Sequence, residues 1–574
     1  MPEAGQGAVA SAPVEGAEAA ASGTAEPGGR LGWAWGSALF CLAVIGLWFL
    51  YLHVSRTQRV ESDGASNALQ AWDMLHGNLL LRGWTVTDVS FYTTELPEYM
   101  LVEAIRGLNA DVLHAAAALS YALLVPLAAI LARGRTTGRE ALFRMLIAAG
   151  IMLAPEPGAG VFIVLFQPDH IGTGVPVLVT WLVLERAPRR WYTPVAIGIL
   201  FTWIGIADQI VLITGVIPLI LVCGVRALRT WHGTMSWRDM PRQAWRPAGL
   251  RAVWYEVSLA VAAVLSVPLA SAFVKVIHAL GGYTVLPVAT QLASPSALPL
   301  HIRLATDGVL GLYGANFQGP PTGVSLFFAI LHLVGVALAI WALWLAFRRF
   351  FRGDDMIAQV LAVSIVVNIL AYLVSGKPTA YWSVREMAGI LPAGAVLAGR
   401  MLGPLLAGSR PAERLRAFFA GGLRTVLTAA LTVILAAYMA ALGWAATRPS
   451  VPGVGQALQG WLRAHDLTYG LAEYGLANST TLASGETVAV RPVVTEPTRL
   501  DPGPHEYNTT WYDPAKHDAN FVVLLATPAA LDPMTTAQAI AAFGHPAHEY
   551  RYKLYLIMTW NKNLLKQLGP PAPD

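Results

Sequence analysis

Long runs of apolar residues with almost no charge recur along this chain, and they constrain its fold more than any other feature. A helix of about 20 such residues matches the roughly 30 Å hydrocarbon core of a bilayer, whereas a helix in a soluble core alternates apolar and polar faces. Apolar residues make up 55% of the 574 residues and charged residues only 13%. We therefore predict an α-helical polytopic membrane protein with about eleven transmembrane helices. The predicted spans are residues 33–54, 112–131, 141–154, 172–184, 191–206, 210–225, 257–276, 325–347, 356–374, 387–406 and 425–446.

Charge, cysteine content and missing motifs exclude several classes of protein. Lys and Arg outnumber Asp and Glu by only 39 to 35, so nothing indicates a nucleic-acid partner. Cys41 and Cys223 both fall within predicted membrane helices, which excludes a disulfide framework and a thiolate metal site. The chain also lacks the motifs of ATP-driven pumps, dinucleotide enzymes and zinc proteases.

The distribution of Arg among the loops predicts the orientation in the membrane. Arg clusters in every second loop, whereas the short intervening loops 167–173 and 207–209 contain neither Lys nor Arg. Because Lys and Arg concentrate on the cytoplasmic side, we predict a multi-pass plasma-membrane protein with a cytoplasmic N-terminus. Eleven crossings then place the C-terminal segment outside the cell, together with the two long loops 55–111 and 277–324.

Composition divides the chain into three parts. Residues 1–30 are poor in large apolar side chains and are predicted to be a disordered cytoplasmic tail. Residues 31–446 form the predicted transmembrane domain. Residues 447–574 are too polar to span a membrane but are regularly patterned, which predicts a small extracytoplasmic α/β domain that supports acceptor selection more than bond formation. Its predicted strands are 487–494, 521–525 and 550–558, and its predicted helices are 454–465 and 535–543.

The segment after the first helix carries the most informative carboxylate. Asp63 stands at the outer mouth of that helix and precedes an amphipathic stretch that contains Met74, Leu75 and Gly77. A carboxylate in this place can act as a base on a lipid-borne substrate. The alternative is structural, because Asp is a favoured N-cap residue and a helix is expected to start near Ala65.

This segment resembles the first outer loop of the GT-C superfamily of membrane glycosyltransferases. In that superfamily an acidic residue, here Asp63, opens the loop, and Met-Leu and Gly follow. The chain departs from the pattern at Gly64, where a second acidic residue is common, and at Gly77, which comes one residue early. The stretch 83–97, which includes Tyr92, resembles the aromatic segment of the same loop. The resemblance implies a GT-C-like fold and a polyprenyl-phosphate-linked sugar donor, with Asp63 as catalytic base.

Two short outer turns carry further candidate residues. Asp169 and His170 adjoin one another, and a carboxylate beside an imidazole can orient an acceptor hydroxyl or bind a divalent cation. The alternative is an N-cap at Asp169 with His170 wetted at the membrane interface. Asp208 lies in the next outer turn, so the three carboxylates are predicted at one membrane face, with Asp169 as the second catalytic candidate and His170 and Asp208 in substrate binding.

Candidate phosphate-binding residues precede the tenth predicted helix. Arg385 and Lys377 are cations on the predicted outer side, and a guanidinium suits a phosphate leaving group. Trp382, like Tyr92, is a candidate for contact with the sugar. The alternative is an interfacial anchor, because Trp, Tyr and Arg all favour that depth in a membrane.

Taken with the resemblance, these residues predict a glycosyltransferase that transfers a sugar, with inversion, to an extracytoplasmic glycan, lipid or protein. The expected partners are membrane lipids, the polyprenyl-phosphate sugar donor and that acceptor. A divalent cation is the one cofactor we consider, and its ligands are unknown. The alternatives are a transporter or flippase of lipid-linked glycans and a non-catalytic subunit of cell-envelope assembly. A repeat-built transporter is expected to show internal symmetry, of which the sequence has no sign.

Overall fold

The computed structural model describes residues 28–234, 247–286, 291–317, 323–407, 421–453, 455–495, 499–503, 505–525 and 534–569. Most of the predicted N-terminal tail and parts of the predicted inner loops 226–256 and 407–424 lie outside these residues. The chain divides into two compact units, Met1–Ala43 and Val44–Asp574. All the fold and site features below belong to the second unit.

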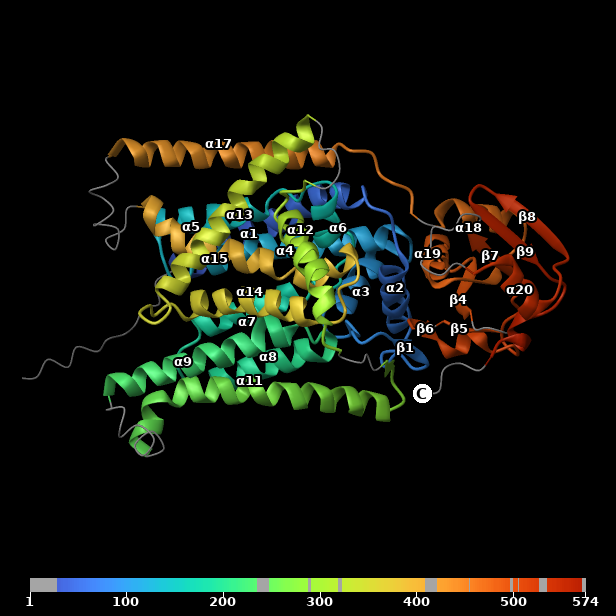
Figure 1. Ribbon diagram of the computed structural model, residues 1–574, viewed down its shortest axis with the longest axis horizontal. Helices are drawn as coiled ribbons and strands as arrows, with labels where there is room; N and C mark the ends of the chain where they lie inside the picture. Colours follow the sequence, from blue (N-terminus) through green and yellow to red (C-terminus); the bar gives the residue numbers. More distant parts are fainter. Residues whose placement is uncertain are drawn as a thin grey trace, which may run out of the picture. The chain divides into compact units, whose positions relative to one another are not determined.

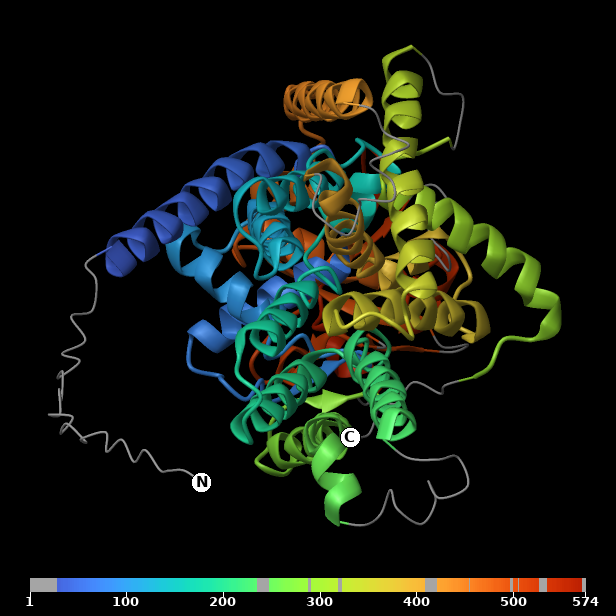
Figure 2. The same cartoon turned by 90° about the vertical axis from the view of Figure 1, so that its left-hand side faces the viewer.

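Each of the eleven predicted apolar runs forms helix. Within the described residues, eight helices are long and apolar enough to cross a membrane, while α5, α7 and α8, which form at the other three predicted runs, have only 15, 13 and 16 residues. These three helices adjoin turns at residues 153–158, 165–173 and 208–210. The chain is a multi-pass membrane protein, and its orientation stays a prediction. Figures 1 and 2 show the helices from the side and from one end. Their bounds are α1 Gly28–Ser55, α4 Asp111–Arg133, α5 Gly138–Met152, α7 Gly174–Arg186, α8 Tyr192–Ala207, η1 Leu212–Val216, α9 Ile217–Thr234, α11 Pro247–Ala279, α13 Val324–Arg348, α14 Met356–Val374, α15 Ile390–Ala407 and α17 Gly421–Ala446.

The predicted outer loops fold into short helices. The first loop forms α2 (Ser62–Leu75) and α3 (Glu95–Arg106), which pack against each other. The turn between α5 and α7 contains α6 (Ala159–Val164). The loop 277–324 contains η2 (Pro295–Ala297) and α12 (Leu298–Leu312), which the sequence did not predict, and α12 packs on α6 and α14. The last of these short elements, η3 (Tyr381–Met387), lies between α14 and α15.

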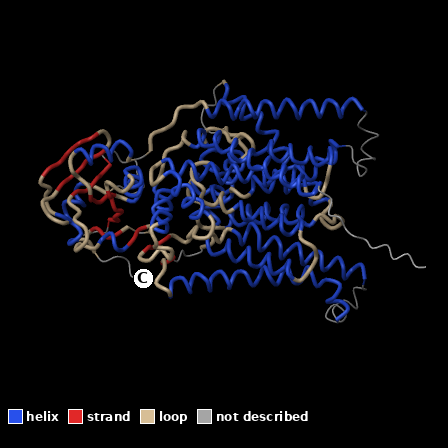
Figure 3. The backbone as a smooth tube through the Cα atoms, turned by 180° about the vertical axis from the view of Figure 1, so that it is seen from behind, coloured by secondary structure: helices blue, strands red, loops and turns tan. Residues whose placement is uncertain are grey.

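The C-terminal segment forms a mixed six-stranded sheet with three helices, which confirms a small strand-containing domain. The strand order is β5-β4-β3-β7-β9-β8, with β3, β4 and β7 parallel. Figure 3 shows the strands of this domain in red. The predicted strand 550–558 is wrong as a single strand, because the chain turns at Lys553, where φ is +52°, and forms the hairpin β8-β9. The elements are α18 Gln456–Ala464, β3 Tyr469–Ala472, α19 Tyr474–Ser484, β4 Ala489–Thr495, β5 Leu500–Pro502, η5 Thr509–Tyr512, β7 Phe521–Leu525, α20 Thr536–Phe543, β8 His548–Tyr552, β9 Tyr555–Thr559 and η6 Leu564–Gln567.

A small second sheet joins this domain to the outer loops. Its central strand, β1 (Trp84–Val86), pairs in parallel with β2 (Thr284–Val285) and antiparallel with β6 (Tyr507–Asn508). The three strands come from the first outer loop, the loop 277–324 and the C-terminal domain. Helix α19 also packs along α2. The C-terminal domain is therefore held against the first outer loop, the region that carries Asp63.

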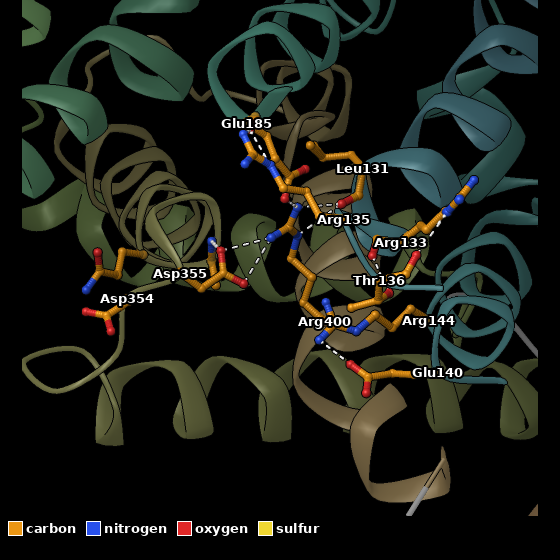
Figure 4. Close-up of polar contacts among 12 residues, drawn as sticks. Leu131, Arg133, Arg135, Thr136, Glu140, Arg144, Glu185, Asp354, Asp355 and Arg400 are labelled. Atoms are coloured by element: carbon orange, nitrogen blue, oxygen red, sulfur yellow. Dashed lines mark hydrogen bonds and ion pairs between the residues drawn. The ribbon is translucent and has the colours of Figure 1, made fainter. Parts of the chain in front are cut away.

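At the predicted cytoplasmic end of the helices, one arginine joins four of them (Figure 4). Arg400 of α15 is only 4% exposed, and its Nη2 donates to Oε1 of Glu185 on α7 at 2.5 Å. Its Nη1 lies 2.9 Å from each carboxylate oxygen of Asp355, the N-cap of α14. Nε and Nη2 also donate to the carbonyl of Leu131 on α4. The network fixes the ends of α4, α7, α14 and α15 relative to one another.

Candidate functional site

The outer turns, η3 and the C-terminal domain enclose a cavity of about 680 Å³. It gathers seven of the eight side chains singled out in the sequence, from segments more than 300 residues apart. These are Asp63, Asp169, His170, Asp208, Lys377, Trp382 and Arg385. Four further acidic or imidazole side chains line it as well, namely Asp88, Glu386, His505 and Glu506. Carboxylates and cations therefore face a single space.

Asp63 lies in the first turn of α2 and faces this cavity. Its Oδ1 accepts a hydrogen bond from the hydroxyl of Tyr474 at 3.0 Å, and its Oδ2 lies 3.4 Å from Nη2 of Arg385. The N-cap alternative is wrong, because α2 begins at Ser62 and its N-cap is Glu61. The Asp63 side chain is 41% exposed and can reach a substrate in the cavity.

Gly64 explains how α2 comes so close to the turn that carries Asp169. A Cβ at Gly64 would lie 2.7 Å from Cδ2 of Leu113 and 2.8 Å from Oε1 of Gln167. The Gly64 N–H donates to that same oxygen of Gln167, at 3.1 Å. A side chain at this position would displace the side chains of Leu113 and Gln167, so glycine allows the close packing seen here.

Asp169 is buried, and Nδ2 of Asn67 on α2 donates to its Oδ1 at 3.1 Å. The capping alternative is wrong, since the N-cap of α7 is Thr173. Burial raises the pKa of Asp169 to about 6, and the attraction of Arg385 opposes that rise. Asp169 is thus a carboxylate that changes its protonation state close to neutral pH.

His170 and Asp208 form a buried ion pair, with Nδ1 of the imidazole 2.8 Å from Oδ2 of the carboxylate. The alternative of a wetted interfacial histidine is wrong, because the side chain is only 20% exposed and is held at a backbone φ of +63°. Burial lowers the pKa of His170, but the attraction of Asp208 and the hydrogen bond to it outweigh burial and raise the pKa to about 9. At neutral pH the imidazole is therefore charged.

The cations of the cavity lie on two neighbouring segments. Lys377 Nζ lies 2.5 Å from Oδ2 of Asp88, and Arg385 lies on η3, one residue before Glu386. Within the described residues, Nη1 of Arg385 is buried without a hydrogen-bond partner. A buried donor of this kind is costly unless a ligand satisfies it, and a phosphate oxygen is a suitable acceptor. Trp382, which lines the same cavity, is 44% exposed.

One sequence candidate does not line the cavity, and several lining residues were not singled out. Tyr92 packs on Tyr283, and its hydroxyl donates to the carbonyl of Leu79. Asp88, His505 and Glu506 carried no local signal, because their place in the site depends on pairing between β1 and β6. For Glu386, the only local signal in the sequence was its position next to Arg385.

An apolar groove of about 280 Å³ adjoins the cavity. Residues of α8, η1 and α11 form its walls, among them Phe201, Leu212 and Val267, and Lys275 lies along it. Asp88, Gln209 and Leu212 line both spaces. The groove and the cavity together offer an apolar path that leads to a charged site.

Within the described residues, no group of three or more His, Cys, Asp or Glu side chains converges as a metal site. The carboxylate of Asp63 already faces the guanidinium of Arg385, and that of Asp169 accepts from Asn67. The divalent cation considered from the sequence stays a prediction, and the mechanism below is derived for the side chains of the chain itself.

No protein-family model and no curated protein sequence matches the chain. Solved structures do resemble it. ArnT from Cupriavidus metallidurans bound to undecaprenyl phosphate is 15% identical with a TM-score of 0.48, over 94% of this chain and 99% of that chain. The apo Archaeoglobus fulgidus oligosaccharyltransferase is 12% identical with a TM-score of 0.46, over 86% of this chain and 70% of that chain.

Proposed function

We propose that this chain is a membrane glycosyltransferase that moves a sugar from a polyprenyl-phosphate-linked donor to an extracytoplasmic acceptor, with inversion at the anomeric carbon. The observation that carries the proposal is a single cavity that holds the accessible carboxylate of Asp63 together with Lys377 and Arg385 and adjoins an apolar groove. These are the groups needed to deprotonate an acceptor, stabilise a phosphate leaving group and hold a lipid tail.

The lipid donor fits the groove with its phosphate in the cavity. The polyprenyl chain lies between α8 and α11, and the phosphate meets Lys377 and the unpartnered Nη1 of Arg385. Asp88 lines both the groove and the cavity and pairs with Lys377. The phosphate therefore meets this cation as it leaves the groove. The sugar then extends toward Asp63.

Asp63 acts as the base in this mechanism. Its carboxylate takes the proton of the acceptor hydroxyl while the hydroxyl oxygen forms a bond to the anomeric carbon. The bond from that carbon to the phosphate oxygen breaks, and polyprenyl phosphate leaves with the electron pair. Arg385 and Lys377 stabilise the negative charge that builds up on the phosphate. Attack from the side opposite the phosphate inverts the configuration.

Asn368 on α14 is a candidate sugar-recognition residue. It lines the cavity and is 1% exposed, yet neither polar atom of its amide has a hydrogen-bond partner in the described part of the chain. A buried amide in this state is expected to bind a ligand. Asn368→Ala should raise the Kd of a sugar-loaded lipid phosphate up to about tenfold, which corresponds to one or two lost hydrogen bonds.

The matched control for Asn368→Ala is bare undecaprenyl phosphate, which lacks the sugar and should bind the variant and the unmodified protein equally. Microscale thermophoresis in nanodiscs with both lipids measures the difference. Equal weakening for the two lipids, or none for either, would exclude a role of Asn368 in sugar recognition.

Proteoliposomes loaded with radiolabelled undecaprenyl-phosphate-linked monosaccharides test the proposed function. With an envelope extract as acceptor, we expect labelled product together with free undecaprenyl phosphate in equal amounts. Movement of the intact lipid-linked sugar between leaflets, without release of undecaprenyl phosphate, would instead identify a flippase. If no sugar of the panel is either transferred or moved between leaflets, the result would favour the non-catalytic subunit.

A further inference from the structure

The C-terminal domain enters the cavity at Asp63. The hydroxyl of Tyr474, the first residue of α19, lies within hydrogen-bond distance of both Asp63 and Glu506. Tyr474 and Glu506 belong to the C-terminal domain, more than 400 residues from Asp63 in the chain. The three side chains form a continuous row that runs from the cavity into the domain.

Three further hydrogen bonds hold this row in place. The Oγ hydroxyl of Ser62, the residue before Asp63, donates to the backbone carbonyl of Tyr474. Nδ2 of Asn478 donates to Ser66 Oγ at 2.7 Å and to the backbone carbonyl of Glu506 at 3.1 Å. Ser62 and Ser66 are four residues apart and share one face of α2, so α19 contacts that face at two points. The orientation of Tyr474 relative to Asp63 is therefore fixed.

Proton placement within the row follows from burial. Burial and the nearby Asp63 raise the pKa of Glu506 well above its usual range, and burial raises the pKa of Tyr474 as well. A phenol has one proton and can donate to one acceptor at a time. The Tyr474 hydroxyl lies within hydrogen-bond distance of an oxygen of each carboxyl group, so it can donate to Asp63 when a protonated Glu506 donates to it.

The backbone of Glu506 is also unusual, since its φ of +54° lies in a region that residues other than glycine rarely adopt. Such a conformation is strained and persists where the surrounding contacts hold it. The hydrogen bonds that join Glu506 to Tyr474 and Asn478 are contacts of this kind.

We propose that Tyr474 and Glu506 are positioning residues that orient the carboxylate of Asp63, so that the C-terminal domain completes the catalytic site. This inference rests on the proposed role of Asp63 as base. It revises the expectation that the domain supports acceptor selection more than bond formation. The charged and titratable groups that face Asp63 are Glu61, Asp169, Arg385, Tyr474, His505 and Glu506.

Tyr474→Phe tests the inference in the full-length protein in nanodiscs, with release of undecaprenyl phosphate from its sugar-linked form as the assay. A misplaced base costs up to about 100-fold in rate, so we expect kcat to fall about 10- to 100-fold while KM for the donor stays within about twofold. A role of Tyr474 in folding or in donor binding would instead raise the KM for the donor along with the loss of kcat.

Tyr469→Phe is the matched control, because it removes a hydroxyl of the same domain that donates to the carbonyl of Trp511, away from the cavity. It should leave both kcat and the KM for the donor unchanged. Glu506→Gln keeps a neutral donor toward Tyr474 and should retain most of kcat, whereas Glu506→Ala should resemble Tyr474→Phe. These two variants carry the test if Tyr474→Phe does not fold.

An unchanged kcat in Tyr474→Phe would overturn the inference. A loss of kcat that comes with an equal rise in the KM for the donor would also overturn it, since that result marks a purely structural role. If Asp63→Asn is inactive while Tyr474→Phe is unaffected, only this inference fails. If Asp63→Asn is active, the proposed base itself is wrong.

Discussion

Asp63→Asn is expected to remove most of the sugar transfer while leaving the fold and donor binding largely intact. Asparagine is nearly isosteric with aspartate and keeps an oxygen that can accept from Tyr474 at the same place. It cannot take the proton of the acceptor hydroxyl. General-base assistance contributes about 10² to 10⁴ in rate, so kcat should fall by that factor. Release of undecaprenyl phosphate by purified protein in nanodiscs measures the loss.

Glu61→Gln is the matched control for Asp63→Asn. Glu61 precedes α2 as its N-cap residue, makes no side-chain capping bond and does not line the cavity. Glu61→Gln should therefore lower kcat far less than Asp63→Asn does. Near-normal turnover by Asp63→Asn would remove Asp63 from the mechanism and transfer the role of base to Asp169, whose Asp169→Asn variant would then be the inactive one.

Arg400→Met is expected to destabilise the membrane domain more than any change in the cavity. Without the guanidinium, Glu185, Asp355 and the carbonyl of Leu131 all lose a donor in a largely buried place (Figure 4). Removal of one partner from a buried ion pair costs about 3–5 kcal/mol, because the other charge stays buried and uncompensated. The free energy of unfolding in mixed detergent micelles should fall by that order.

Arg303→Met provides the comparison for Arg400→Met. Arg303 is 80% exposed and pairs with Asp307 at 3.7 Å along one face of α12. Exposed pairs of this kind contribute little, so the free energy of unfolding should hardly change. Equal effects of the two substitutions would show that the Arg400 network does not hold the four helices together. Adding Glu185→Gln to Arg400→Met should recover part of the loss, because it removes one of the unpaired charges.

The sequence was informative wherever the free energy depends on local composition. The runs 112–131 and 356–374 coincide closely with α4 and α14, since a stretch of apolar residues is stable in lipid whatever its neighbours are. The start predicted for the helix at 535–543 also holds, because Thr535 and Gln538 form a capping box within four residues. Local signals of this kind do not depend on the rest of the fold.

Local patterns were misleading where a polar turn competes with helix or strand. The pattern at 550–558 gave no sign of the turn at Lys553, because both arms of the hairpin have strand composition. The short helices α5, α7 and α8 end at turns whose polar residues have partners elsewhere, as His170 does in Asp208. The stability of such turns comes from those partners and not from the neighbouring residues.

The sequence by itself determined that the chain spans a membrane repeatedly, and it brought forward Asp63, Asp169, Asp208 and Arg385, because charged residues between apolar runs are conspicuous. Only the tertiary structure decided that these side chains share one cavity, that Tyr92 lies outside it, and that Tyr474 and Glu506 of the C-terminal domain reach Asp63. The physical reason is the range of the interactions. Insertion into lipid depends on the sum of neighbouring side chains, whereas a hydrogen bond across 411 residues depends on how distant segments pack.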